Sequence, residues 1–267
     1  MNHNLEDFAQ YFLEVSSEQR LKIIQLVNEK EYRLSELAKK LDATTPEVHR
    51  NLERLEKSGF IIKTVKSHFE LTTLGQMVLG LIPNLAFMIE NKKYFLEHPI
   101  SSLPHKFISR LGELFECKLL TSYVDVFESW KKIYENSEEY IYNILYDVPY
   151  FDDFTKPIYN RLSNGVKMKS IFYEKAMVSS SRGEVVKKLK KFIDNGDIQR
   201  MMTKKIGAAV FLNEKQSCIV FPNTDGKLDV GYAFVGDNFL FHQWCFDYFN
   251  YSWYNATPFV ESRLGKS

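Results

Sequence analysis

The chain has 267 residues, which is long enough for two domains of ordinary size. Apolar residues make up 45% of it and charged residues 26%, a balance typical of folded globular proteins and not of disordered ones. Because 35 Lys and Arg nearly balance 34 Asp and Glu, any affinity for nucleic acid must come from a local basic patch and not from the whole surface.

The cysteine pattern and the hydropathy bear on the compartment. Cys117, Cys218 and Cys245 lie far apart, with no CxxC pair and no Cys/His cluster, which argues against a structural zinc site or a disulfide framework. We find neither a signal-peptide pattern nor an apolar run of about 18 residues. We therefore predict a cytoplasmic protein with no metal site, no cofactor and no membrane partner.

Two helices are expected at the start of the chain. Residues Asn4 to Val15 carry apolar side chains at helical spacing. Ser16 with Gln19 then matches a capping box, in which two side chains satisfy free backbone N–H groups at the start of a helix. We expect both helices to brace the segment that follows.

Residues 32–73 predict two short helices and a hairpin. In the first helix, Leu34, Leu37, Ala38 and Leu41 have the i, i+3, i+4, i+7 spacing of one buried face. The hairpin follows at 60–72, where β-branched and aromatic residues flank a basic tip at 66–68. This order is typical of a helix-turn-helix with a wing.

The second helix has start and stop signals of its own. Thr44 as N-cap would form a capping box with Glu47, whereas Thr45 as N-cap would place Pro46 at the first helical position, where its missing N–H costs nothing. Gly59 is expected to end the helix in the left-handed conformation that favours glycine. Both ends of the helix are therefore predicted to within one residue.

A helix of this size fits the major groove, and Lys and Arg outnumber Asp and Glu between Tyr32 and His68. We expect Arg50 and Arg54 to contact bases or phosphates. The whole predicted DNA-binding set is Thr45, Glu47, His49, Arg50, Arg54, Lys57, Lys63, Lys66 and His68. The alternative is that the module docks on proteins of the transcription machinery and has no operator of its own.

The pattern Leu37-Ala38…Leu41…Val48…Leu52…Leu55-Glu56…Gly59-Phe60-Ile61 resembles the winged-helix module of archaeal and bacterial metal-sensor-like transcription regulators. A further helix is expected after Thr72-Thr73, and Pro83 predicts a kink or a division into two helices. Apolar residues recur in it at near-heptad spacing, which favours a homodimer seam over packing within the domain. These positions are Leu74, Val78, Leu81, Leu85, Met88 and Phe95.

Beyond residue 90 the pattern changes to alternating β-type and α-type segments, which predicts a second domain over 91–267 after a DNA-binding domain over 1–90. The predicted strands are Cys117–Thr121, Glu139–Leu145, Val166–Phe172, Ile198–Met202, Ala208–Leu212, Ser217–Phe221 and Val230–Val235. The predicted helices are Val124–Asn136, Phe154–Ser163, Ser181–Asn195 and an aromatic-rich last helix capped by Asp237-Asn238. The last three strands suit an antiparallel meander. The fold class is therefore α+β, a winged helix followed by an α/β domain.

Four weak motifs of the second half resemble the effector domain of archaeal winged-helix regulators of the methanogenesis and filamentation regulatory protein family. They are Phe107-Ile108…Leu111…Leu114, Gly165-Val166-Lys167-Met168-Lys169, Phe221-Pro222-Asn223-Thr224-Asp225-Gly226-Lys227-Leu228-Asp229 and Trp244…Tyr248-Phe249…Tyr251. The resemblance implies a transcription regulator whose second domain is related to the phospholipase-D fold and used for sensing.

Catalysis of the phospholipase-D type needs a histidine followed by lysine at the second position, and none of the six histidines meets this requirement. No phosphate-binding glycine loop or protease motif is present either. We therefore predict no enzyme and no catalytic residues, with a lipid- or phosphodiester-acting enzyme as the least favoured reading. A ligand pocket remains compatible with the aromatic content. Its candidate residues are Arg161, Arg200, Asp229, Tyr232, Trp244 and Tyr248.

Overall fold

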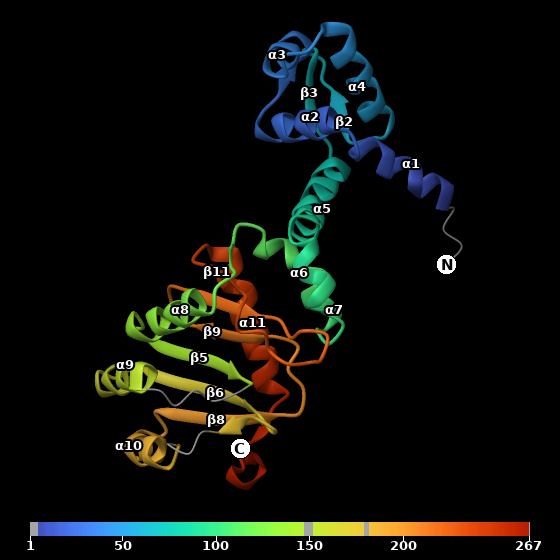
Figure 1. Ribbon diagram of the computed structural model, residues 1–267. Coiled ribbons are helices and arrows are strands. Elements are labelled where there is room, and N and C mark those ends of the chain that lie inside the picture. The colour runs from blue at the N-terminus through green and yellow to red at the C-terminus, as the bar shows by residue number, and fades with distance from the viewer. Residues whose placement is uncertain (1–4, 147–151, 179–181, 267) are drawn as a thin grey trace. The chain divides into compact units, whose positions relative to one another are not determined.

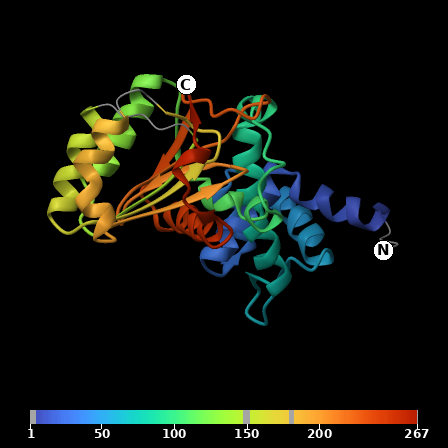
Figure 2. The same ribbon diagram turned by 90° about the horizontal axis from the view of Figure 1, so that it is seen from below.

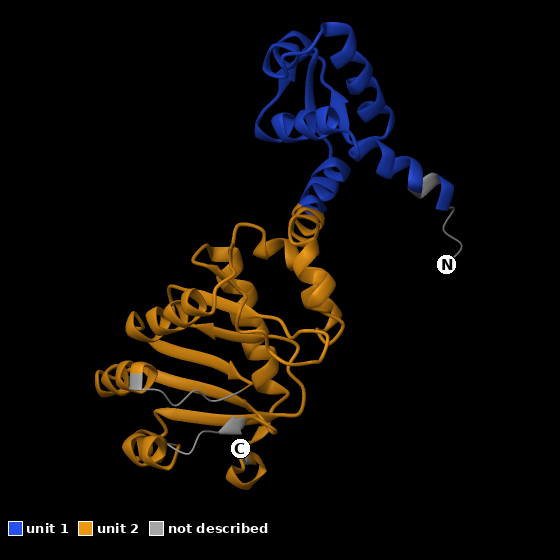
Figure 3. Cartoon of the chain, in the orientation of Figure 1, with its two compact units in different colours: residues 1–82 blue, residues 83–267 orange. Residues whose placement is uncertain are grey.

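The structure is a computed structural model that describes residues 5–146, 152–178 and 182–266 (Figure 1). The chain forms two compact units, residues 1–82 (unit 1) and 83–267 (unit 2), shown in Figure 3. The division falls inside helix α5 (Thr73–Glu90), whereas the sequence analysis places the domain boundary after this helix. The fold class is α+β, as predicted.

Unit 1 is a helix-turn-helix with a three-stranded sheet. In chain order its elements before α5 are α1 (Leu5–Val15), α2 (Glu18–Glu29), β1 (Tyr32–Arg33), α3 (Leu34–Lys40), α4 (Thr45–Lys57), β2 (Ile61–Lys63) and β3 (His68–Leu71). The strand order is β1-β3-β2, with both pairings antiparallel. Ile23, Ile24, Leu37, Val48 and Leu52 are almost fully buried, so α2, α3 and α4 share one core.

The two ends of α4 show one prediction confirmed and one corrected. At its C-terminus Gly59 has φ +74°, and the N–H groups of Gly59 and Phe60 donate to the carbonyls of Glu56 and Leu55, which is a Schellman motif. At its N-terminus Thr44 is the N-cap, but its side chain makes no capping hydrogen bond. The Glu47 carboxylate instead accepts a hydrogen bond from Gln19 Nε2 at 3.0 Å.

The capping box predicted for Ser16 and Gln19 is also absent. Ser17 is the N-cap of α2 and makes no side-chain capping bond, while Ser16 Oγ donates backward to the carbonyl of Leu13. The Gln19 side chain instead forms hydrogen bonds with Glu47 and Asn51 of α4. These contacts between helices replace the predicted capping interaction.

Helix α5 runs without interruption through Pro83. Of the two predicted effects of this proline, a kink or a division into two helices, the division does not occur. Among the described residues, α5 is the helix that is long and apolar enough to cross a membrane, with a mean hydropathy of 1.3 over 18 residues. This corrects the expectation that no apolar stretch of that length exists, although a single such helix is only a weak indication of a membrane span. Of the predicted seam residues, Leu74, Leu81 and Leu85 are exposed along α5, as is Met77. The other three are corrected, because Val78 packs against the core of unit 1, and Met88 and Phe95 pack against a core of unit 2.

Unit 2 is built on one large mixed sheet. Its helical elements after α5 are α6 (Lys92–Glu97), α7 (His105–Ile108), η1 (Leu111–Leu114), α8 (Tyr123–Glu135), α9 (Asp152–Ser163), α10 (Arg182–Asp194), α11 (Phe239–Tyr254) and η2 (Glu261–Arg263). Its strands are β4 (Lys118–Leu120), β5 (Tyr140–Leu145), β6 (Lys167–Tyr173), β7 (Met177–Val178), β8 (Ile198–Thr203), β9 (Ala209–Leu212), β10 (Ser217–Val220), β11 (Ala233–Gly236), β12 (Thr257–Pro258) and β13 (Gly265–Lys266).

The eight-stranded sheet has the order β12-β8-β6-β5-β9-β10-β11-β4. The neighbours β8, β6 and β5 are parallel, while β9, β10 and β11 form the predicted antiparallel meander. Helices α8, α9 and α10 cover one face of this sheet, and α11 covers the other (Figures 1 and 2). The helix predicted from Ser181 is observed from Arg182, and Ser181 itself lies outside the described residues.

The two faces of the sheet have separate cores. One packs Trp130, Phe154 and Phe192 from the three covering helices against the sheet. The other packs the aromatic residues of α11 with η1 and α7. As predicted, Asn238 caps α11, its side chain accepting a hydrogen bond from the N–H of Phe241 at 2.9 Å.

Candidate functional site

The outward face of α4 is the first candidate surface. Val48, Leu52 and Leu55 are buried, and at about 100° per residue Arg50 and Lys57 lie on the opposite side of the helix. Both side chains are exposed. Among the described residues no acid forms an ion pair with Arg50. The helix therefore presents two cations to solvent. The contacts of its buried side with the core fix the direction in which they point.

Arg54 occupies a different position from Arg50. Its Nε and Nη2 donate to the two carboxylate oxygens of Glu14 on α1 at 2.9 and 2.8 Å, a bidentate pair. The Glu14 residue is only 8% exposed, and Arg20 also approaches its carboxylate at 3.3 Å. The hydrogen bond from Arg54 holds the pKa of Glu14 below its ordinary value, against the opposing effect of burial. The structure therefore places Arg54 as a link between α4 and α1.

A polar network continues on the same side of α4. Asn51 donates to Gln19 and accepts a 3.3 Å hydrogen bond from Arg20 Nη1, while Glu47 accepts from Gln19. These side chains belong to α2 and α4 and fix the two helices against each other. Glu47, predicted at the DNA surface, therefore belongs to this internal network.

The other predicted positions lie on the exposed part of α4 and on the wing. Thr45 and His49 are exposed, and His49 Nδ1 lies 3.6 Å from Glu53 Oε1. On the wing, Lys63 and Lys66 are exposed, with Lys66 in the turn between β2 and β3. His68 is half-buried, and its Nδ1 has no hydrogen-bond partner among the described residues. The structure thus leaves the cations Arg50, Lys57, Lys63 and Lys66 exposed, whereas Glu47 and Arg54 contact α2 and α1.

The six predicted ligand residues do not form one site. Trp244 is fully buried and Tyr248 is 4% exposed; the Tyr248 hydroxyl accepts a hydrogen bond from the N–H of Ala208 at 3.0 Å in the core under α11. This corrects their assignment as walls of a pocket, because a side chain packed in the core presents no surface to a ligand. Asp229 lies 3.4 Å from His98 Nε2, and Tyr232 packs near the same histidine. Arg161 lies on the last turn of α9.

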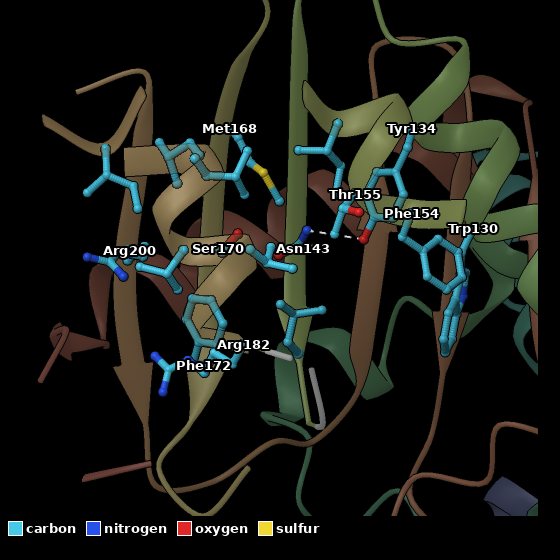
Figure 4. Close-up of a pocket in the computed structure, with 17 residues that line it drawn as sticks. Trp130, Tyr134, Asn143, Phe154, Thr155, Met168, Ser170, Phe172, Arg182 and Arg200 are labelled. Atoms are coloured by element: carbon cyan, nitrogen blue, oxygen red, sulfur yellow. Dashed lines mark hydrogen bonds between the residues drawn. The ribbon is translucent and has the colours of Figure 1, made fainter. Parts of the chain in front are cut away.

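Arg200 does line a cavity, on the opposite face of the sheet. The cavity has a volume of about 90 Å³ and lies between the parallel strands and α8, α9 and α10 (Figure 4). Its walls are mostly apolar, and its polar side chains include Asn143, Ser170, Arg182 and Arg200. Small-molecule sites commonly combine apolar walls with a few polar groups in this way.

Three of these four polar residues were not predicted from the sequence. Asn143 interrupts the strand Tyr-Ile-Tyr-Asn-Ile-Leu, and Ser170 together with Lys169 interrupts Met-Lys-Ser-Ile-Phe. Strands of a parallel sheet covered on both faces are normally almost continuously apolar, so these two interruptions were a usable signal. Arg182 gave no signal, because one more basic residue at the start of a charged helix is ordinary.

Comparisons with known proteins give partial matches. Residues 10–92 match the family model described as HVO_A0261 N-terminal domain, which spans less than half of the chain. No curated protein matches the sequence. The resemblance to the methanogenesis and filamentation regulators is not tested by these matches and stays a prediction.

Solved structures show similarity at low identity. TrmBL2, described as an archaeal chromatin protein with a novel mode of DNA binding, is 12% identical with a TM-score of 0.42, over 90% of this chain and 92% of that chain. NucT from Helicobacter pylori is 14% identical with a TM-score of 0.41, over 54% of this chain and 99% of that chain. The phospholipase D family member Nuc from Salmonella typhimurium is 12% identical with a TM-score of 0.38, over 55% and 100%. Identities and TM-scores at this level carry no assignment of function.

Proposed function

We propose that the protein is a dimeric, sequence-specific DNA-binding transcription regulator, and that a small molecule or a partner bound by unit 2 tunes its affinity for the operator. The observation that carries this proposal is the outward face of α4, where Arg50 and Lys57 are exposed opposite the buried stripe. Lys63 and Lys66 add exposed cations on the wing.

The geometry suits the major groove of DNA. A helix-turn-helix places its second helix in the groove with outward side chains at base edges, while neighbouring cations contact phosphates. Arg50 is the best base-contact candidate, because a free guanidinium can form two hydrogen bonds with guanine. Arg54 is held by Glu14, so we assign it the role of aiming α4 and not that of reading bases.

The proposed dimer contact lies on α5. Leu74, Met77, Leu81, Leu85 and Ile89 are exposed and follow one another at intervals of three or four residues, which places them on one side of the helix. An apolar stripe with this spacing fits the seam of a two-helix contact. Two copies would then present two α4 helices to two half-sites.

We also propose that unit 2 is not an enzyme and that the protein works in the cytoplasm. The first point is supported by the absence of a histidine followed by lysine at the second position, the pair that phospholipase-D chemistry requires. The second is supported by the separated cysteines, none of which could pair with a neighbour in sequence.

Selection of bound fragments from random duplex DNA tests the proposal. The full chain should enrich a near-palindrome whose half-sites lie about one helical turn apart. On the selected site, Arg50→Ala should weaken binding by about 1–3 kcal/mol and relax the preference at one base pair. Lys22→Ala is the matched control, because it removes one exposed cation from α2 and leaves α4 unchanged.

Two outcomes would overturn the proposal. Failure to enrich any sequence would favour the alternative, a module that docks on transcription machinery. Equal binding by Arg50→Ala and Lys22→Ala would mean that α4 does not read the site.

A further inference from the structure

The floor of the cavity in unit 2 contains a row of polar residues across three adjacent strands. Asn143 on β5 is in register with Ser170 on β6, and Ser170 is in register with Arg200 on β8. Residues paired in register share a face of a sheet, so the three side chains form one line under α8, α9 and α10. All three line the cavity (Figure 4).

The rows on either side of this line are apolar. Two residues back along the strands the row is Ile141, Met168 and Ile198, and two residues onward it is Leu145, Phe172 and Met202. All six are buried. Apolar residues at the central row would serve the core equally well, so packing alone does not account for a carboxamide, a hydroxyl and a guanidinium there.

Asn143 gives a second, independent indication of a ligand. Its residue is fully buried, and its Nδ2 donates a long hydrogen bond of 3.4 Å to the Tyr134 hydroxyl. Its Oδ1 has no hydrogen-bond partner among the described residues. A buried carbonyl oxygen without a donor is costly, so this atom is suited to accept a hydrogen bond from a molecule in the cavity.

Two arginines that line the cavity supply positive charge to it. Arg182 at the start of α10 and Arg200 on β8 both pair with the carboxylate of Glu261, the second at 3.9 Å. The Arg200 guanidinium also lies 4.2 Å from the centre of the Phe259 ring, which holds it in place. Glu261 is 57% exposed in its side chain, so it can yield its place to another anion. The Glu261 carboxylate shows that this pair of arginines can bind an anionic group.

We propose that the cavity binds a small organic anion that carries a hydroxyl group close to its charged end. The anionic oxygens would pair with Arg182 and Arg200 in place of Glu261, and the hydroxyl would donate to Asn143 Oδ1. A cavity volume of about 90 Å³ suits a small ligand. This inference rests on the proposed function, in which unit 2 senses an effector.

A carboxylate and a phosphate share this chemistry, and a binding experiment distinguishes them. Calorimetric titration of the full chain with glycerate and with glycerol 3-phosphate should show saturable binding of at least one. Glycerol lacks the charge and propionate lacks the hydroxyl, so each should bind at least tenfold more weakly than the better hydroxylated anion. Binding of glycerate alone would assign a carboxylate ligand, and binding of glycerol 3-phosphate alone a phosphate ligand.

Variants locate the site. Arg200→Gln should weaken binding at least tenfold, whereas the matched control Arg161→Gln, which changes an arginine outside the cavity, should leave it unchanged. Asn143→Leu should remove the preference for glycerate over propionate. Glu261→Gln should tighten binding at least threefold, because it removes the competing carboxylate, and a gain of this kind cannot arise from misfolding.

Three results would overturn the inference: no binding of either hydroxylated anion, equal effects of Arg200→Gln and Arg161→Gln, or weaker binding by Glu261→Gln. These titrations contain no DNA. A failure here therefore leaves the DNA selection untouched, and a failed DNA selection leaves the titrations interpretable.

Discussion

Replacing Asn143 by leucine should cost unit 2 little stability, although it removes a buried hydrogen bond. Asn143 makes one hydrogen bond, at 3.4 Å, and leaves Oδ1 without a partner. A buried polar atom without a partner costs about 1–3 kcal/mol, while a hydrogen bond contributes about 0.5–1.5 kcal/mol at ordinary length and less when it is long. The change also leaves the buried Tyr134 hydroxyl without this partner, which offsets the removal of the unpaired Oδ1. We therefore expect Asn143→Leu to change the free energy of unfolding by no more than about 1 kcal/mol.

Asn213 offers a matched control in the same unit. It is also fully buried, but its Nδ2 donates to the carbonyl of Ile133 at 2.8 Å, and its Oδ1 accepts from the N–H groups of Lys215 and Gln216 at 2.8 and 2.7 Å. Asn213→Leu removes three good hydrogen bonds and should lower the free energy of unfolding by about 3 kcal/mol. Because both changes place leucine at a fully buried asparagine, the apolar gain is similar and the comparison isolates the hydrogen bonds.

Urea denaturation followed by tryptophan fluorescence measures both variants. All three tryptophans of the chain, Trp130, Trp244 and Trp253, lie in unit 2, so the signal does not report on unit 1. If Asn143→Leu lowers the free energy of unfolding as much as Asn213→Leu, the Asn143 carboxamide is needed for the fold. Its presence would then need no ligand to explain it.

Three further predictions concern other parts of the chain. Because the hydrogen bond from Arg54 lowers the pKa of Glu14, its stabilising effect on unit 1 is present above the ordinary pKa of 4.5 and is lost as the pH falls through the lowered value. Circular dichroism of Glu14→Gln should therefore show a weaker acid dependence than the unchanged protein. Leu81→Lys on α5 should convert a dimer to a monomer in light scattering with its circular dichroism spectrum kept, and a monomeric unchanged protein would contradict the seam. Burial raises the pKa of the Cys117 and Cys218 thiols to about 12. Alkylation of these thiols by iodoacetamide at pH 8 should therefore be far slower in the native than in the unfolded protein. Equal rates would contradict their burial.

Local signals in the sequence were sufficient for the longer helices and strands, whereas short elements such as β1, α7 and β12 were not predicted. The stripe of Val48, Leu52 and Leu55 together with Gly59 places α4 within one residue, because a helix and its end depend on neighbouring positions. The predicted strands and helices of unit 2 follow in the same way from period and turn residues. Capping was less predictable, since Gln19 and Glu47 were drawn into contacts between helices.

The functional geometry depends on distant pairs, which the sequence does not reveal. Glu14 and Arg54 are 40 positions apart, and nothing local marks them as partners. The aromatic residues of α11 surround the whole helix, so its buried side could not be chosen, and Trp244 was assigned to a ligand site when it belongs to the core. The sequence shows Asn143 as a single polar residue in an apolar strand. Its alignment with Ser170 depends on the register of the two strands, which the sequence does not show.

The row formed by Asn143, Ser170 and Arg200 joins three segments that are separated by 27 and 30 positions in the chain but adjacent in the sheet. A molecule resting on that row would brace β5, β6 and β8 against one another at their midpoints. Amide hydrogen exchange would then slow in all three strands together when the cavity is filled. Protection confined to a single loop would point to a ligand that sits elsewhere.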